Sequence, residues 1–376
     1  MSLLFWGSVL AVLYTYFGYP LILLIISRYT RRDTSLAQRA YTPSVTLIIT
    51  AHNEAARIEN KLQNTLELEY PPESMEIIVA SDASTDGTDE TVRQYAQRGI
   101  RLVRSPRRAG KEFAQKCAIQ EARGDVIVFS DVATILDRHA IRTIVSNFSD
   151  PKVGCVSSED RFIDETGRVS GEGAYVRYEM WLRSLETKVH SLVGLSGSFF
   201  AARRLLCLDW PADIPSDFNT LLNAIRHGYR GVNDPKSIGT YTNIKDETRE
   251  FQRKVRTITR GISALMHDPS LMNPLRYGIF SWQIISHKLM RWLVPLFLVV
   301  TLVMNVILAL QRRWYVLILS VQAAFYGLAL SGSRHADRSL LLKIPYYFLQ
   351  VNRAIAVAWL KYLKGERYVT WTPSAR

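Results

Sequence analysis

Long uncharged apolar stretches constrain this 376-residue chain more than any other feature. Leu3 to Ser27 is one such stretch of roughly 25 residues and Trp292 to Leu310 is another of roughly 19, each long enough to cross a bilayer as a helix. Trp314 to Leu330 is shorter but also uncharged, and residues 311–313 before it suit a tight turn between antiparallel helices. The sequence therefore predicts a membrane protein with three spans.

The last apolar stretch, residues 340–363, has a different pattern. It carries Lys343, Gln350, Arg353 and Lys361 at spacings that place them near one helical face. This pattern indicates a helix that lies in the membrane interface. A fourth crossing that contains a functional arginine is the alternative.

Basic residues follow the first stretch directly, at Arg28, Arg31, Arg32 and Arg39, whereas the two residues before it carry no charged side chain. By the positive-inside rule, the central region faces the cytoplasm. The first stretch has no preceding basic residue and no cleavage signature of small residues, so we expect an uncleaved anchor rather than a signal peptide.

The formal net charge of +13 is strongly basic. Proximity to anionic lipid explains this charge more economically than nucleic acid does, so nucleic acid is not an expected partner. The same field would favour ligands that contain a pyrophosphate. The three cysteines form no CxxC pair and predict neither a zinc site nor a disulfide framework.

The central region alternates between two patterns. Apolar strand-like runs are separated by amphipathic helical patterns, and this order predicts a parallel doubly wound sheet in its first half. The expected strands are 45–50, 76–81, 100–104, 125–130 and 198–202, and the expected helices are 55–66, 88–98, 111–122, 173–190, 217–227 and 246–266. The predicted organisation is an anchor at 1–28, a cytoplasmic domain at 42–268, a juxtamembrane segment at 269–291, a helical hairpin at 292–331 and an interfacial or fourth spanning helix with the tail at 340–376.

Polar residues occur repeatedly where the predicted strands end. Ligands bind beyond the carboxyl ends of the strands in an open parallel sheet. Thr50, His52 and Glu54 follow the first strand, Asp82 the second and Asp131 the fourth. Helix capping is the alternative role for a single aspartate such as Asp82. Three polar strand ends at one edge predict a binding site.

These segments resemble family 2 glycosyltransferases. The resemblance rests on residues 49–54 (ITAHNE), residues 81–88 (SDASTDGT) and residues 129–131 (FSD), and it extends to residues 286–292 (SHKLMRW) and to the closing residues 369–371 (VTW). It implies an α/β domain of the GT-A type, with a Rossmann-like mixed sheet and with transmembrane helices at both ends of the chain.

The resemblance also implies a donor site for a nucleotide-sugar, usually a UDP-sugar. The residues that it places around the base, the ribose and the diphosphate are Thr50, His52, Glu54, Asp82, Lys111, Asp131, Arg253 and Arg256. A solvated basic loop is the alternative for Lys111, and a basic helix face on lipid headgroups is the alternative for the two arginines. Asp131 would hold a divalent metal, Mg²⁺ or Mn²⁺, that stabilises the leaving diphosphate. The family motif is Asp-x-Asp, and here Ala133 stands in the second position. The second metal ligand is therefore unassigned.

On the acceptor side, the resemblance points to the loop at Gly197 and Ser198 and to an acidic motif at Asp217. A sugar hydroxyl is a poor nucleophile at neutral pH, so a carboxylate within hydrogen-bond reach must take its proton. Asp217 is the candidate general base, and a helix cap is its alternative role. The family's tryptophan position holds Thr257, which counts against a processive polymerase without excluding one.

The expected function is an inverting glycosyltransferase in a bacterial inner membrane. It would pass a sugar from a nucleotide-sugar to a lipid-linked or glycan acceptor in the assembly of a surface polysaccharide or glycolipid. One alternative is a processive synthase that exports its polymer, alone, as an oligomer or with an export partner. The other is an inactive membrane scaffold, which the missing second aspartate motivates.

Overall fold

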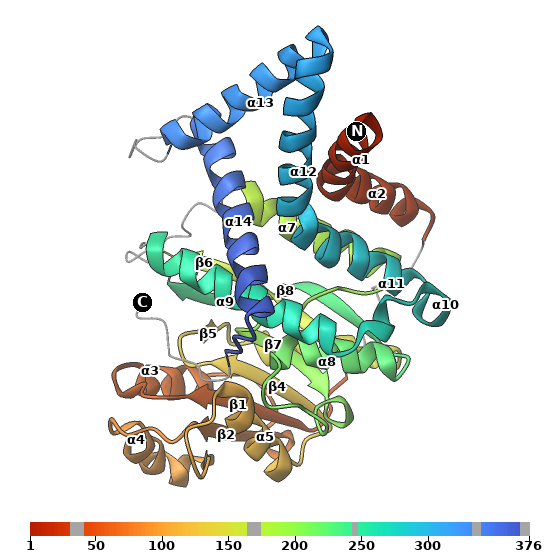
Figure 1. Ribbon diagram of the computed structural model, residues 1–376. Helices are drawn as coiled ribbons and strands as arrows, with labels where there is room; N and C mark the ends of the chain where they lie inside the picture. Colours follow the sequence, from red (N-terminus) through yellow and green to blue (C-terminus); the bar gives the residue numbers. More distant parts are fainter. Residues whose placement is uncertain (31–40, 164–173, 243–246, 333–339, 369–376) are drawn as a thin grey trace. The chain divides into compact units, whose positions relative to one another are not determined.

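The computed structural model describes residues 1–30, 41–163, 174–242, 247–332 and 340–368. The chain divides into two compact units (Figure 1). The sheet unit contains residues 26–244 and 264–280, and the helical unit contains residues 1–25, 245–263 and 281–367. Arg31, Arg32 and Arg39, with the closing residues 369–371, lie outside the described residues.

The sheet unit is built on a mixed eight-stranded sheet of order β3-β2-β1-β4-β7-β6-β8-β5. The strands β1 to β4 pair in parallel, β7 is antiparallel to both β4 and β6, and β8 is parallel to β6 and antiparallel to β5. The strands are β1 (Val45–Ala51), β2 (Met75–Ser81), β3 (Ile100–Arg104), β4 (Val126–Asp131), β5 (Ile135–Leu136), β6 (Val153–Ile163), β7 (Phe199–Arg203) and β8 (Arg230–Thr242).

The helices of the sheet unit connect these strands, except the last helix, which follows β8. They are α3 (Ala55–Leu66), α4 (Thr88–Gln94), α5 (Lys111–Glu121), α6 (Ala140–Ser146), α7 (Ala174–Val189), α8 (Ser216–Arg226) and α10 (Pro274–Tyr277). Short 3₁₀ turns occupy η3 (Pro72–Ser74), η4 (Ala96–Arg98), η5 (Asn147–Ser149), η6 (Arg204–Leu206) and η7 (Pro269–Met272).

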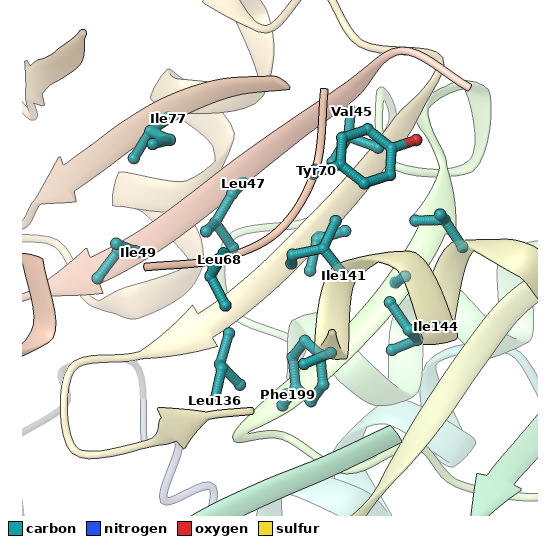
Figure 2. Packing of buried hydrophobic residues seen from close by; sticks show 14 of the residues in the cluster. Val45, Leu47, Ile49, Leu68, Tyr70, Ile77, Leu136, Ile141, Ile144 and Phe199 are labelled. Atoms are coloured by element: carbon teal, nitrogen blue, oxygen red, sulfur yellow. The ribbon is translucent and has the colours of Figure 1, made fainter. Parts of the chain in front are cut away.

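The strand β1 is buried on both faces. Leu47 and Ile49 belong to one buried cluster with Ile141 and Ile144 of α6, and residues of α3 and α4 complete it (Figure 2). Successive strand residues point to opposite faces, and on the other face Thr50 accepts a hydrogen bond from Gln115 of α5 at 3.0 Å. Each fully buried Leu or Ile contributes about 1.5–3 kcal/mol to the stability of the fold. This packing holds the strands in place and so fixes the positions of their carboxyl ends.

The expected strands and helices of the first half agree with the structure within a few residues. The parallel sheet, however, ends at β4, because β7 enters antiparallel beside it. The long strands β6 and β8 and the short β5 were absent from the sequence-based expectation. The charged run Glu159–Arg161 in β6 and Pro235 in β8 break the apolar alternation by which a strand is recognised.

The helical unit holds the apolar stretches. Its main helices are α1 (Ser2–Leu13), η1 (Tyr14–Gly18), α2 (Tyr19–Tyr29), α9 (Glu247–His267), α11 (Ile279–Ile284), η8 (Ile285–Leu289), α12 (Met290–Gln311), α13 (Arg313–Gly332) and α14 (Leu340–Leu363). The π-helical turns η1 and η8 meet where Tyr14 bonds to Ser286 at 2.7 Å and accepts from Trp282 at 2.9 Å. The helix α14 packs on α12 and α13 (Figure 1).

Three helical segments of the described chain are long and apolar enough to cross a membrane. They are Ser2–Tyr29, Ile279–Gln311 and Arg313–Gly332. These segments mark the chain as a membrane protein and include the three stretches expected from the sequence. The second is longer than expected, because α11 and η8 run into α12 without interruption. The helix α14 does not meet the same criterion of length and composition.

Candidate active site at the sheet edge

Two loops meet beyond the carboxyl ends of β1 and β2. Asn53, in the left-handed region at a φ of 52°, accepts from the backbone N–H of Thr85 at 2.9 Å. Its own N–H donates to Ser84 at 3.1 Å, and the N–H of Glu54 donates to Thr88 at 2.9 Å. These reciprocal bonds use the short polar side chains of both motifs to hold the loops as one structure.

The three residues expected around the nucleotide from β1 are largely enclosed. Thr50 is fully buried, and the ring of His52 donates through Nδ1 to the carbonyl of Asp82 at 2.7 Å. Glu54 is 3 % exposed and pairs with Arg57 at 2.6 Å. Burial raises the pKa of Glu54, and the neighbouring Arg57 offsets only part of that rise. These side chains therefore shape the loop.

Asp82 is fully buried and organises the segment before α5. Its Oδ1 accepts from the backbone N–H of Ala109 at 2.8 Å, and its Oδ2 accepts from the N–H of Gly110 at 2.9 Å. Gly110 has a φ of 99°, a conformation that favours glycine. Asp82 thereby positions Lys111, the first residue of α5.

Lys111 links β4 to the loop before β7. Its ammonium group lies 2.5 Å from Oδ1 of Asp131 and donates to the carbonyl of Gly197 at 2.8 Å. Asp131 is the last residue of β4, and its backbone N–H donates to the carbonyl of Ser198 at 3.0 Å. The side chains of Lys111 and Asp131 are 12 % and 26 % exposed, so both are accessible to a ligand.

Asp217 lies beside the same loop. It is in the first turn of α8, and a side-chain Cβ at Gly197 would come within 3.0 Å of its Oδ2. Gly197 therefore contacts Asp217 on one side and, through its carbonyl, Lys111 on the other. Asp131, Lys111, Gly197 and Asp217 form a connected series, here called the edge cluster.

Two residues near the edge cluster were missed from the sequence. Lys61 of α3 is fully buried and donates to Ser130 at 2.8 Å and to the carbonyl of Thr134 at 2.5 Å. Burial lowers its pKa to about 7, and the charge of Asp131 opposes that shift. The sequence did contain a sign of this burial, because Lys61 follows Ile58 by three residues and so lies on the same, buried face of α3.

The second missed residue, Asp160 of β6, orders the acceptor loop. Its Oδ1 accepts from the hydroxyls of Ser196 and Ser198, each at 2.6 Å. Nothing in the sequence around Asp160 distinguishes it from the charged residues beside it. The Ser198 hydroxyl is thus already engaged by a carboxylate.

Arg253 and Arg256, expected near the diphosphate, lie on α9 in the helical unit. Arg253 donates to both carboxylate oxygens of Glu250, at 2.7 and 2.8 Å. Their contact with a diphosphate stays a prediction.

The edge cluster offers one carboxylate, Asp131, to a metal ion. Among the described residues, no group of three His, Cys, Asp or Glu side chains converges as a metal site would require. Mg²⁺ commonly takes one or two protein carboxylates and completes its shell with substrate phosphates and water. The cluster therefore fits a cation that arrives with a diphosphate and does not fit a cage made by the protein alone.

Comparison with known proteins matches one segment of the chain to a family. Residues 46–206 match the family described as Glycosyl transferase family 2, a segment that runs from β1 to η6 and holds Asp82, Lys111, Asp131 and Gly197. This match identifies residues 46–206 as a segment of the glycosyl transferase family 2 type. The resemblance read from the sequence motifs is confirmed, and so is its enzyme class, glycosyltransferase.

Several curated proteins are similar to this chain. The poly-beta-1,6-N-acetyl-D-glucosamine synthase of Staphylococcus aureus is 25% identical over 246 residues, which are 63% of this chain and 59% of that protein. The probable glycosyltransferase YdaM of Bacillus subtilis is 33% identical over 128 residues, 32% of this chain and 30% of that protein. This chain thus spans about three fifths of the length of the synthase that it matches.

A solved structure shares the fold. The mannosyltransferase PcManGT from Pyrobaculum calidifontis, in complex with GDP-Man and Mn²⁺, superposes with a TM-score of 0.75 at 22% identity. The match covers 96% of this chain and 99% of that one. The expected fold class is confirmed: a GT-A domain with a mixed sheet, and long apolar helices at both ends of the chain.

Proposed function

We propose that this chain is an inverting membrane glycosyltransferase. It transfers a sugar from a nucleotide-sugar to an acceptor associated with the membrane. The observation that carries the proposal is the edge cluster, in which Lys111 joins Asp131 to the loop that contacts Asp217. We assign Asp131 to the diphosphate of the donor and Asp217, next to Gly197, to the acceptor.

Asp217 is the general base. Its carboxylate accepts the proton of the acceptor hydroxyl while that oxygen attacks the anomeric carbon. The bond from the anomeric carbon to the phosphate oxygen breaks, and its electron pair leaves with the nucleoside diphosphate. Attack on the face opposite the leaving group inverts the configuration of the sugar.

Lys111 stabilises the leaving group. Its ammonium group would exchange Asp131 for a phosphate oxygen when the donor binds, because both partners are anionic oxygens. A divalent cation held by Asp131 and the diphosphate would neutralise further charge on the departing phosphates. Asp82 keeps Lys111 in place through the loop at Ala109 and Gly110.

The donor and the location follow from the relatives and from charge. The mannosyltransferase is in complex with GDP-Man, and the synthase makes a polymer of N-acetylglucosamine, so UDP-sugars and GDP-mannose are the donors to test first. Arg28, at the end of the first apolar helix, and the basic residues after it favour an inner-membrane protein with a cytoplasmic sheet unit.

The test uses the purified full-length chain and a panel of nucleotide-sugars. We expect release of nucleoside diphosphate from one donor in the presence of Mg²⁺ or Mn²⁺, stimulated by a lipid extract that contains acceptor. If the chain neither binds nor hydrolyses any donor, the proposed enzymatic activity is rejected and an inactive scaffold is favoured.

A second candidate is a processive synthase, which the match to the Staphylococcus aureus protein favours. Product length decides between the two. A ladder of long chains made from one donor would support the synthase, and addition of a single sugar would reject it.

A further inference from the structure

Two cavities in the helical unit share part of their lining. One, of about 470 Å³, lies between α12, α13 and α14 and is lined mainly by apolar side chains such as Leu298 and Leu302. The other, of about 380 Å³, lies between α9 and α14 and is lined by polar and aromatic residues. Tyr346, Gln350 and Arg353 line both cavities. These two adjoining cavities are here called the α14 groove, with an apolar end and a polar end.

The polar end carries excess positive charge. Glu250, its acidic residue, is bound by Arg253 through two hydrogen bonds, and Lys254 lies 3.7 Å away. Burial alone would raise the pKa of Glu250, but the bonds and charges of Arg253 and Lys254 outweigh it and hold that pKa below its ordinary value. One ionised carboxylate thus faces Arg253 and Lys254, and Arg353 adds a further positive charge to the lining.

Arg353 differs from the cations of α9 in having no acidic partner among the described residues. Its guanidinium lies 5.3 Å from the centre of the Phe251 ring, and no carboxylate in the described part of the chain forms a salt bridge with it. Arg353 is an exposed residue of α14, so its guanidinium is open to a ligand. The planar guanidinium matches two oxygens of a phosphate group at once.

Gln350 marks the junction between the two ends. Its amide nitrogen donates to the Tyr346 hydroxyl at 3.1 Å, while its Oε1 is buried and has no hydrogen-bond partner in the described structure. Beyond it the lining turns apolar, with Leu349 and Ala356 from α14. The groove thus passes within one side chain from a charged site to a hydrocarbon-like one.

We propose that the α14 groove binds a lipid with one phosphate group on a single hydrocarbon chain. The phosphate lies against Arg353 and Lys254, and the chain occupies the apolar end. Cavities of this size hold ligands of drug-like dimensions, which suits part of one chain better than the two chains of a common phospholipid. Only the identification of this lipid as the membrane-associated acceptor rests on the proposed function.

The phosphate, more than the hydrocarbon chain, decides which lipid binds in the groove. Lipid tails are as apolar as leucine, so a chain gains little by leaving the bilayer for the apolar end of the groove. An anion beside Arg353, in contrast, gains charge-assisted hydrogen bonds that it lacks in a neutral bilayer. Removing the Arg353 charge should therefore weaken binding more than changing the chain.

The test measures binding of hexadecyl phosphate to the full-length chain in neutral phosphatidylcholine nanodiscs by native mass spectrometry. Arg353→Gln should weaken binding by about 10-fold or more, the factor that a lost charge-assisted hydrogen bond gives. Lys343→Gln is the matched control: Lys343 is an exposed cation on the same helix that does not line the groove, and binding should not change. Ala356→Phe, which fills the apolar end, should also weaken binding.

Three results would overturn the proposal. They are equal binding by Arg353→Gln and the unaltered chain, equal binding of hexadecanol, which lacks the phosphate, and full displacement of the probe by inorganic phosphate, which would indicate a site for free anions. Release of nucleoside diphosphate from the donor is measured separately. Loss of lipid binding with donor cleavage retained therefore separates this inference from the proposed function.

Discussion

In the sheet unit Lys111 is held by Asp131 and by the carbonyl of Gly197, whereas in the helical unit Arg353 has the ring of Phe251 beside it and no carboxylate among the described residues. A ligand that enters the edge cluster must replace contacts that already exist. A ligand that enters the α14 groove meets a charge without a counter-ion. The first arrangement favours exchange of one anionic partner for another, and the second favours retention of an anion.

The largest effect is expected at Asp217, because loss of a general base removes proton transfer from the reaction. Asp217→Asn should lower sugar transfer by about 10²–10⁴-fold. Donor affinity, measured by calorimetry, should change little, since the role proposed for Asp217 is toward the acceptor. Retained turnover in this variant would contradict its assignment as the base.

Lys111→Met tests the exchange of partners in the edge cluster. The variant loses a charge-assisted contact with the diphosphate, so donor affinity should fall by about 10-fold or more. Mn²⁺ affinity in the absence of donor should rise, because Asp131 is no longer neutralised. Lys152→Met, at an exposed position on the same unit, is the matched control and should change neither affinity. Unchanged donor affinity in Lys111→Met would remove Lys111 from the donor site.

Gly197→Ala tests the contact between the acceptor loop and the base. The added methyl group would lie 3.0 Å from Oδ2 of Asp217 and displace that carboxylate. We expect transfer to fall by about 10-fold, since small displacements of a catalytic group are costly. Donor affinity is the internal control, and a parallel loss of both would show that the substitution acts on the donor site instead.

Lys61→Met tests the buried lysine behind β4. The folded-state pKa of Lys61, about 7, is below its ordinary value of 10.5, so the unfolded chain binds this proton more tightly. Lys61 should therefore make the unaltered chain more stable as the pH rises from about 7 to 10.5, by at most on the order of 1 kcal/mol per pH unit. The difference in melting temperature between the chain and Lys61→Met should change across that window. A difference in melting temperature that stays constant across this pH window would show that folding does not lower the pKa of Lys61.

The smallest effect is expected for Lys254→Gln. Lys254 already lies 3.7 Å from Glu250, so its loss should weaken hexadecyl phosphate binding by only about 2–3-fold, as for a partly screened surface charge. The comparison with Arg353→Gln is the informative measurement. Equal losses in the two variants would show that the absence of a carboxylate beside Arg353 has no consequence.

The sequence allowed prediction of the strand ends and the apolar spans because each depends on a local pattern. The alternation from β1 to β4 places Asp82 and Asp131 at one edge, and the run of uncharged residues defines a span without reference to the rest of the fold. The contacts between individual side chains do not depend on a local pattern. That Asp82 binds the backbone at Gly110, or that Arg353 lies over Phe251, depends on how distant segments pack. The strands β6 and β8 were missed for the same reason, since their pairing stabilises sequences with poor strand patterns.

The position of a bound metal ion tests the central claim most directly. Crystals of the full-length chain grown with Mn²⁺ and the accepted nucleotide-sugar would reveal the ion by anomalous scattering. We predict a peak within coordination distance of the Asp131 carboxylate, with the diphosphate beside Lys111 and the sugar facing Asp217. A nucleotide-sugar and metal bound away from Asp131, with Lys111 still paired to it, would contradict the account.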